Sequence, residues 1–304
     1  MRRYCRAWAM ADRALHLYLP AHLRADHEAG KTNILSRIIE ALPGWALHHH
    51  PEAEGAEPPA RGGYTLTHMQ EPQDRRTLCL RRAYYYPFWR IEPTNERWNF
   101  AVARKAPDYS RIPPRARAFH ARLRERVLAG RESTREGFVF MPLQGRLLDH
   151  RSFQSMSPMA MIAETLARQP LPVVATLHPG ETYTGAERVA LAGVTDPRFR
   201  LVEAPSAELL ARCDHVVTQN SSVALQAMIA GKGAVLFAGI DFHHPAGSVL
   251  RDGIEAAFAR GAAPPDRMAE YLWWFFRHEA IDAQAPDAPA RIAALLKAQG
   301  WPIA

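Results

Sequence analysis

Cysteine is scarce in this chain, and long hydrophobic runs are missing from it. Only Cys5, Cys79 and Cys213 occur among 304 residues, and their spacing matches neither a CxxC motif nor a zinc pattern. This excludes a disulfide-stabilised scaffold, and we expect three small, buried side chains in a reducing compartment. No apolar stretch approaches the roughly 20 residues that span a bilayer, which argues against a membrane-spanning helix.

The N-terminal residues also lack the apolar region of a signal peptide. The short apolar segment Trp8–Ala11 is followed at once by Asp12 and Arg13. We therefore expect a cytoplasmic protein. Hydrophobic residues make up 47% and charged residues 23% of the chain, which are globular values, and its length suits two domains.

Acidic residues are outnumbered, and the net charge is +7 with a pI near 9.6. Much of the excess lies between Arg111 and Arg135, where arginines alternate with apolar residues at helical spacing. A solvated helix face is one interpretation of this segment; attraction to anionic lipid or to a polyanionic glycan is the other. The chain has no recognised DNA- or RNA-binding motif, so we do not expect nucleic acid as a partner.

The first part of the chain predicts irregular α/β structure. Strands are expected at 15–19, 45–49, 64–69 and 77–80, and a helix through 34–42 with Thr32 or Asn33 as its cap. The aromatic run 84–89 is either core or a sugar-stacking surface. Lys31 and Asn33 are expected to be surface residues. His48, His49 and His50 are a poor metal site, because consecutive residues cannot share one face of a strand.

The second part of the chain alternates short strands and helices, which is typical of a parallel sheet. Its continuous apolar strands favour burial on both faces. Expected strands are 138–143, 172–177, 199–203, 215–218 and 234–239; expected helices are 159–168, 186–192, 206–211 and 223–230. Ser206 is a candidate N-cap and Gly231 a candidate helix stop. Two more helices are expected after these elements. An aromatic helix at 268–277 is expected to pack across the two domains, and a last helix is expected at 286–297.

Ligands of parallel α/β sheets bind beyond the carboxyl ends of the strands, and polar residues follow three of the expected strands there. His178, Pro179, Gly180 and Glu181 come directly after PVVATL. A tight turn would hold the imidazole at the strand edge, where it could donate a hydrogen bond to a phosphate. A structural histidine before a turn is the alternative.

A second polar segment, Asn220-Ser221-Ser222, precedes the helix VALQAMIA. A helix N-terminus attracts phosphate through its free N–H groups and partial positive charge, and the serines add hydroxyl donors. An ordinary N-cap is the alternative. Because both segments belong to one predicted sheet, together they favour a phosphate site, with Gly239 at the end of the next strand as a supporting residue.

The third segment runs from Gln144 to His150 after FVFMPL. Asp149 could reach the anomeric carbon of a sugar as a nucleophile or as a base; a cap of a helix or turn is the alternative. Gln144 is a candidate supporting residue at the start of this segment.

Taken together, the motifs FVFMPLQGRLLD, HP and VVTQNSSVALQAMIAGKGAVLFAGIDFHH resemble the capsule polysaccharide glycosyltransferases of the β-Kdo transferase kind. The likeness covers about 138–244, with a looser match at 84–92. It implies a GT-B-like fold of two Rossmann-like α/β domains with parallel sheets, the C-terminal one more regular. The domains are expected at 1–135 for the trimmed acceptor side and 136–265 for the nucleotide-sugar side, with packing helices at 266–304.

The resemblance also implies an activity. The chain would transfer a sugar, Kdo or a related ulosonic acid, from a CMP-activated donor to a surface polysaccharide or lipid-linked acceptor. His178, Ser221 and Ser222 would hold the CMP phosphate, and Asp149 would act at the anomeric centre with retention. No cofactor or metal is expected, because a histidine and a helix N-terminus stabilise the leaving group. Peripheral contact with the anionic inner membrane is a further expectation.

One position departs from the family. Gln226 stands where the family commonly has glutamate, and an amide cannot accept a proton or pair with a cation as a carboxylate does. Two alternatives therefore stay open: an inactive nucleotide-binding protein that keeps the fold, and a transferase that uses another nucleotide-sugar donor.

Overall fold

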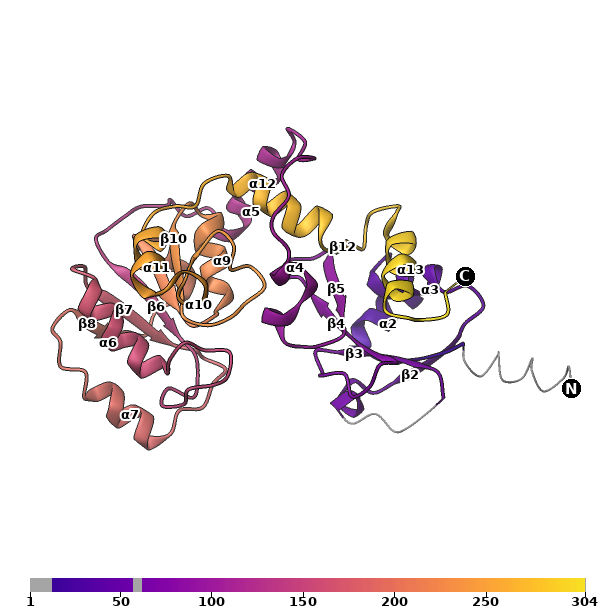
Figure 1. Ribbon diagram of the computed structural model, residues 1–304, viewed down its shortest axis with the longest axis horizontal. Coiled ribbons are helices and arrows are strands. Elements are labelled where there is room, and N and C mark those ends of the chain that lie inside the picture. The colour runs from indigo at the N-terminus through magenta and orange to yellow at the C-terminus, as the bar shows by residue number, and fades with distance from the viewer. Residues whose placement is uncertain (1–12, 57–61, 304) are drawn as a thin grey trace, which may run out of the picture. The chain divides into compact units, whose positions relative to one another are not determined.

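The structure is a computed structural model that describes residues 13–56 and 62–303. The chain forms two compact units (Figure 1). Unit 1 runs to Arg104 and resumes at Phe275, and unit 2 runs from Lys105 to Trp274. Cys5 and the segment Trp8–Ala11 lie outside the described residues, so the expectations placed on them are not addressed.

Unit 1 is built around a six-stranded mixed sheet in the order β12-β5-β4-β3-β1-β2. Its elements are β1 (Ala14–Tyr18), α2 (Ala21–Glu28), α3 (Ile34–Ala41), β2 (Ala46–His50), η1 (Glu52–Ala56), β3 (Tyr64–His68), β4 (Thr77–Arg82), β5 (Phe88–Glu92), η2 (Arg97–Asn99), α4 (Ala101–Arg104), β12 (Ile281–Asp282) and α13 (Ala288–Ala298). Strands β1 to β4 pair in parallel, whereas β5 is antiparallel to both of its neighbours, β4 and β12. The prediction of a parallel sheet therefore holds for four of its six strands.

The core of unit 1 lies between this sheet and two helices distant in sequence. Leu15 and Leu17 of β1 point to the face that α3 and α13 cover, as the two-residue period of a strand requires. The apolar stripe predicted for α3 is buried there. The aromatic run 84–89 is mainly core, because Phe88 and Trp89 are at most 2% exposed, although Tyr86 remains 39% exposed.

Unit 2 is a regular α/β domain around a six-stranded sheet in the order β11-β10-β9-β6-β7-β8. Its elements are α5 (Ala116–Leu128), β6 (Val139–Leu143), α6 (Pro158–Arg168), β7 (Val173–Leu177), α7 (Gly185–Ala192), β8 (Phe199–Leu201), α8 (Ser206–Arg212), β9 (His215–Thr218), α9 (Ser222–Ile229), β10 (Gly233–Leu236), β11 (Gly247–Ser248), α10 (Val249–Asp252), α11 (Ile254–Gly261) and α12 (Met268–Trp273). All its strand pairs are parallel, as predicted.

Both faces of the unit 2 sheet are covered. Val139, Met141 and Leu143 of β6 join one core cluster with α6 and α11. On the other face α8 and α9 pack against β6, β9 and β10. Strand β6 is buried along its whole length, which explains why its sequence is a continuous apolar run. The fold-class prediction of two α/β units with mainly parallel sheets is confirmed.

The basic segment between Arg111 and Arg135 contains the predicted amphipathic helix. In α5, Phe119 and Leu123 are buried and pack on unit 2, while Arg117 and Arg122 are exposed. The structure thus groups α5 with unit 2, whereas the sequence placed it before the boundary at 135. The second observed division, at Trp274, falls within the aromatic segment, where α12 continues into a π-helical turn, Trp274–His278.

Several local expectations are confirmed and two are wrong. Asn33 caps α3, as predicted, but it is 4% exposed and therefore not the surface residue that the sequence predicted. Gly231 ends α9 with a φ of 85°. Ser206 does not cap α8, because Pro205 occupies that position and no side chain bonds the helix end. Cys79 and Cys213 are buried free thiols, and burial raises their pKa values to about 11 and about 12.

Among the described residues, the helices are all too short or too polar to cross a membrane.

Candidate functional site

The residues predicted to bind phosphate lie along one edge of the unit 2 sheet. Strand β6 sits between β7 and β9, with Leu143 paired to Leu177 and Phe140 paired to Val216. Continuing these registers places Gln144 level with His178 on one side and with Asn220 on the other. Neighbouring strands are about 4.8 Å apart, so the backbones of the two outer loops are separated by about 10 Å. Side chains from both can reach one bound group.

Direct contacts join three of the predicted residues. The Asn220 backbone N–H donates to Oε1 of Gln144 at 3.3 Å, and its side-chain amide donates to the Gly239 carbonyl at 3.2 Å. The ends of β6, β9 and β10 are thereby tied together. Asn220 thus links Gln144 to Gly239, while their part in binding a donor stays a prediction.

His178 is exposed at the end of β7 and held in one tautomer. The Gly180 N–H donates to its Nδ1 at 3.1 Å. Because a backbone N–H can only donate, Nδ1 accepts and the ring proton of the neutral imidazole lies on Nε2. His178 therefore presents an N–H donor away from its own turn, which is the form that a phosphate oxygen can accept from.

At the end of β9, Ser221 is the N-cap of α9, and its Oγ accepts from the Val223 N–H at 3.3 Å. The cap uses an oxygen lone pair, so the hydroxyl proton stays available for donation. Ser222 is exposed, and Gln226 lies one turn further on the same face of the helix, half-buried. Capping and anion binding are thus compatible at this helix end.

Asp149 lies in an exposed turn after β6. Its carboxylate pairs with the Arg146 guanidinium at 2.6 Å, and its N–H donates to the Arg146 carbonyl. Arg146 has a φ of 62°, a left-handed backbone that is uncommon outside glycine. The described contacts of Asp149 are confined to its own loop, which fits the turn interpretation and leaves its catalytic role a prediction.

Glu181 and Gly145 show how closely the loops after β6 and β7 approach. A Cβ placed on Gly145 would lie 2.4 Å from Oε2 of Glu181, so a larger residue there would require the Glu181 side chain to move. Glu181 can accept hydrogen bonds from hydroxyl groups but repels phosphate. An anion at this edge is therefore favoured near His178 and Ser221 rather than over Gly145.

Three residues that the sequence analysis did not single out support these loops. Glu187 is buried and accepts from the backbone N–H groups of Thr184 and Leu147, and these bonds lower its pKa. Tyr183 accepts from the His178 N–H at 2.9 Å; burial raises its pKa. The T-x-x-E capping box at Thr184 was a readable signal for Glu187; Tyr183 had none.

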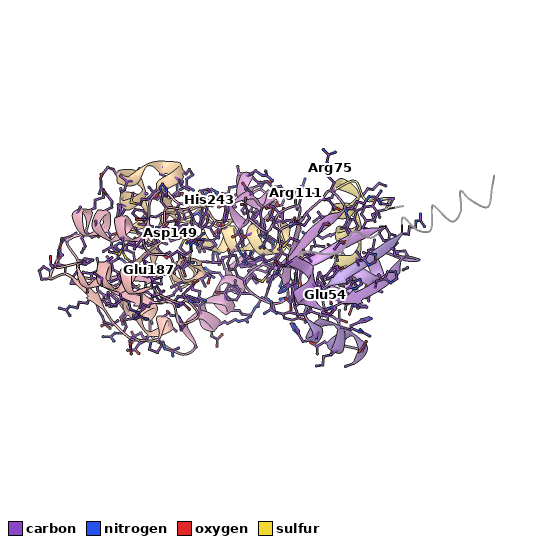
Figure 2. All side chains as sticks on the ribbon, turned by 90° about the horizontal axis from the view of Figure 1, so that it is seen from below. Glu54, Arg75, Arg111, Asp149, Glu187 and His243 are labelled. Atoms are coloured by element: carbon purple, nitrogen blue, oxygen red, sulfur yellow. The ribbon has the colours of Figure 1, made fainter. Side chains whose placement is uncertain are left out.

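Arg151 is the third residue of this region that the sequence analysis did not single out. Its guanidinium lies over the Phe153 ring at 4.8 Å, and its Nε is buried without a hydrogen-bond partner. Burial lowers its pKa and neighbouring Arg146 adds to this, while the carboxylates of Glu181 and Asp149 act in the opposite direction. Arg151 therefore adds a cation close to the carboxylates of Glu181 and Asp149. Figure 2 labels Asp149 in this part of unit 2.

A hollow of about 710 Å³ adjoins His178. It lies between the loops that follow β7 and β8, and Thr176, Tyr183, Glu203 and Ser206 contribute to its wall. Hydroxyl groups and a carboxylate in a partly apolar hollow suit a polyhydroxyl ligand such as a nucleoside. Glu203 was not singled out from the sequence because nothing local marks it.

Within the described ranges, no group of three or more histidine, cysteine, aspartate or glutamate side chains is arranged to hold a metal ion. His48 and His50 lie on one face of β2, where their rings stack with that of His16 at centroid distances of 4.9 and 5.2 Å. They stack rather than converge on a point. Lys31 is exposed and paired with Asp26, as expected for a surface residue.

No protein-family model matches the chain, and no curated protein sequence matches it. Its structure is similar to the KpsC β-Kdo 2,7 transferase of Thermosulfurimonas dismutans, with 12% identity, a TM-score of 0.49, and coverage of 94% of this chain and 99% of that chain. The KpsC β-Kdo 2,4 transferase of the same organism has 12% identity and a TM-score of 0.47, with coverage of 86% of this chain and 89% of that chain. The wall teichoic acid polymerase TagF has 11% identity and a TM-score of 0.32, with coverage of 95% of this chain and 89% of that chain.

Proposed function

We propose that this chain is a glycosyltransferase that uses a nucleotide-activated sugar, with CMP-Kdo or a related CMP-ulosonic acid as donor. The observation that carries the proposal is the alignment of His178, Gln144 and Asn220 at one carboxyl edge, next to the N-terminus of α9. Parallel sheets bind nucleotides at this edge. The acceptor would be a surface or capsular polysaccharide or a lipid-linked glycan.

In this proposal the donor phosphate lies between His178 and α9. The Nε2–H of His178 and the hydroxyl groups of Ser221 and Ser222 donate to its oxygens, and the positive end of the helix dipole favours its charge. The nucleoside extends into the adjoining hollow, where Glu203 accepts from ribose hydroxyls. These groups stabilise CMP as it departs, so the reaction as proposed needs neither a metal nor a cofactor.

Asp149 is the proposed nucleophile. An oxygen of its carboxylate bonds to the anomeric carbon as the bond from that carbon to the phosphate oxygen breaks. The acceptor oxygen then bonds to the anomeric carbon as the bond to Asp149 breaks, and the hydroxyl proton passes to solvent water. The two inversions give retention. In the observed loop the carboxylate is neutralised by Arg146, so this pair must open, or the arginine must move to the departing phosphate, before attack.

An inactive nucleotide-binding protein is the second candidate. The half-buried amide of Gln226 and the exposed Arg146–Asp149 pair are the observations that favour it. Both candidates bind nucleotide, and only the first catalyses transfer. Binding and turnover therefore have to be measured separately.

Calorimetric titration with CMP, and with UMP, UDP and GDP as controls, tests the proposal. We expect selective CMP binding that weakens by about 1.5–3 kcal/mol in His178→Ala, since a charge-assisted hydrogen bond is lost. Asp149→Asn should bind CMP as the wild type does and transfer no sugar. Absence of binding to any nucleotide would refute the proposal, and full transfer by Asp149→Asn would remove this residue from the reaction.

A further inference from the structure

A second hollow of unit 2, also of about 710 Å³, lies away from the proposed donor site. Its wall includes Ala263, whose carbonyl oxygen would lie 2.8 Å from a Cβ on Gly233, the first residue of β10. The hollow therefore reaches the amino edge of the sheet, whereas His178 and Ser221 follow its carboxyl edge. The two edges are roughly one strand length, about 10 Å, apart.

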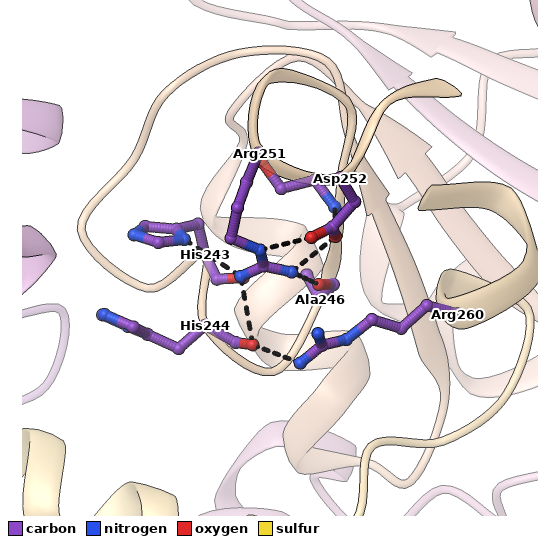
Figure 3. Close-up of polar contacts among 7 residues, drawn as sticks. His243, His244, Ala246, Arg251, Asp252 and Arg260 are labelled. Atoms are coloured by element: carbon purple, nitrogen blue, oxygen red, sulfur yellow. Dashed lines mark hydrogen bonds and ion pairs between the residues drawn. The ribbon is translucent and has the colours of Figure 1, made fainter. Parts of the chain in front are cut away.

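The loop that forms one wall of this hollow is fixed by Arg251. Its guanidinium pairs with Asp252 at 2.6 Å and donates to the carbonyls of His243, His244 and Ala246. Figure 3 shows these bonds radiating from one side chain. Arg251 is thereby fully engaged, and the loop carrying both imidazoles is held in one conformation before any ligand arrives.

Arg260 is engaged differently. From α11 it donates one hydrogen bond, at 2.6 Å, to the His244 carbonyl (Figure 3), and no carboxylate among the described residues pairs with it. The exposed guanidinium therefore keeps donors at the hollow, and its charge acts on Asp252 without a direct ion pair. Guanidinium forks match the two oxygens of a carboxylate or phosphate.

The remaining wall suits the body of a sugar. Tyr109 is half-buried, with Arg267 over one ring face at 4.5 Å, and its hydroxyl lies near Arg260. Burial raises the pKa of Tyr109, so its hydroxyl stays protonated and can donate. Asp266 adds an acceptor, and Pro107 and Pro245 add apolar surface. A ligand with one oxyanion, several hydroxyls and an apolar ring face matches this set.

We propose that this hollow binds an acidic sugar residue of a glycan chain, with its carboxylate on Arg260 and its hydroxyls on Asp266 and Tyr109. The assignment of a glycan as the source rests on the proposed function; the oxyanion preference rests on the hollow alone. Such a site would hold a chain at a distance from the transfer reaction and keep it on the protein between additions.

The methyl glycoside of a ulosonic acid is the probe, and its methyl ester, which keeps the hydroxyls and removes the charge, is the control. We expect the full-length protein to bind the acid about tenfold or more tightly than the ester. Arg260→Gln should abolish this difference, and Arg260→Lys should restore part of it. Arg122→Gln, which removes an exposed arginine of α5, should bind as the wild type does, and so should His178→Ala.

Equal affinity of wild type for acid and ester, no binding of the acid, or unchanged binding by Arg260→Gln would overturn the proposal. So would loss of binding in His178→Ala, which would place the sugar at the donor site. Tighter binding of inorganic phosphate than of the acid would overturn the choice of a carboxylate. CMP titration of Arg260→Gln separates the two proposals, because CMP affinity should be unchanged there whatever becomes of the sugar acid.

Discussion

His215 is a titratable residue whose burial keeps it neutral at neutral pH. It begins β9, is 2% exposed, and its Nε2 is buried without a hydrogen-bond partner. Burial lowers its pKa from 6.5 to about 4. The folded protein therefore keeps the ring neutral at pH values where the unfolded chain already binds a proton. The stability that this neutral ring allows is fully present above pH 6.5 and is lost as the pH falls toward 4.

We predict that acidification from pH 7.5 to 4 costs the wild type about 3 kcal/mol more unfolding free energy than it costs His215→Leu. Leucine has no proton to bind, so the variant lacks this contribution. Urea denaturation across the pH range measures it, and using the difference between the two proteins cancels the titration of their shared carboxylates. Parallel pH profiles for the two proteins would contradict the assignment.

At the residue scale, the sequence predicted which polar side chains follow the strands, but not which hydrogen bonds fix the loops that carry them. His178, Asn220 and Ser221 follow apolar strands directly, so a sheet model predicts their common edge. Tyr183 and Glu187 act through tertiary hydrogen bonds to other loops, and no local pattern reports these bonds. Gln226 could be placed on its helix, but its effect on activity depends on the ligand.

At the scale of elements, the N-terminus of helix α3 is capped by the side chain of Asn33. Oδ1 of Asn33 accepts from the N–H groups of Leu35 and Ser36 at 2.9 and 3.2 Å, and its Nδ2 donates to the Leu23 carbonyl at 2.7 Å. We predict that Asn33→Ala lowers the unfolding free energy by about 1–2 kcal/mol, because a buried cap is lost. Thermal or urea denaturation measures this.

Ser206→Ala is the matched control for that prediction. Ser206 also lies at a helix start, but its side chain makes no capping bond to α8. Its replacement should change stability by less than about 0.5 kcal/mol. Equal losses in the two variants would mean that the observed cap of α3 contributes nothing specific.

Helices and strands with a clear hydrophobic pattern were predicted well, whereas elements that exist through tertiary contacts were not. Strand β9 was predicted with its observed bounds, and β6 and β7 each to within one residue, because their apolar runs end at polar residues. Helices α2 and α11 were missed. Helix α2 buries only Leu23 and so shows no apolar stripe. Helix α11 does carry one, since Ile254, Ala257 and Phe258 stand at helical spacing, and the sequence analysis overlooked it. Strand β12 has two residues and exists only through its pairing with β5.

At the scale of the whole molecule, composition shifts predicted two units but not that one of them is discontinuous. The predicted boundary at 135 treated α5 as the end of the first domain, yet α5 packs on α9 and α12. Conversely, α13 packs on α3, and Arg37 donates to the Ala283 carbonyl at 2.9 Å. Contacts between residues more than 200 positions apart leave no trace in a local pattern.

This connectivity predicts unequal behaviour of the two units when the chain is cut. Unit 2 is one continuous stretch, from Lys105 to Trp274, and contains all six strands of its sheet and both of its helical layers. A fragment of residues 105–274 should therefore unfold cooperatively and bind CMP with the affinity of the full chain. A fragment of residues 13–104 lacks β12 and α13, so part of its core would be exposed, and it should not fold alone.

Circular dichroism during urea denaturation and calorimetric CMP titration of both fragments decide this. Mixing the short fragment with a peptide of residues 275–303 should restore a cooperative transition, because the peptide supplies Ile292 and Leu296 to the core beside α3. An unfolded 105–274 fragment would show that unit 2 depends on unit 1 for its stability. A folded fragment that fails to bind CMP, beside a full chain that binds it, would instead place part of the nucleotide site on unit 1.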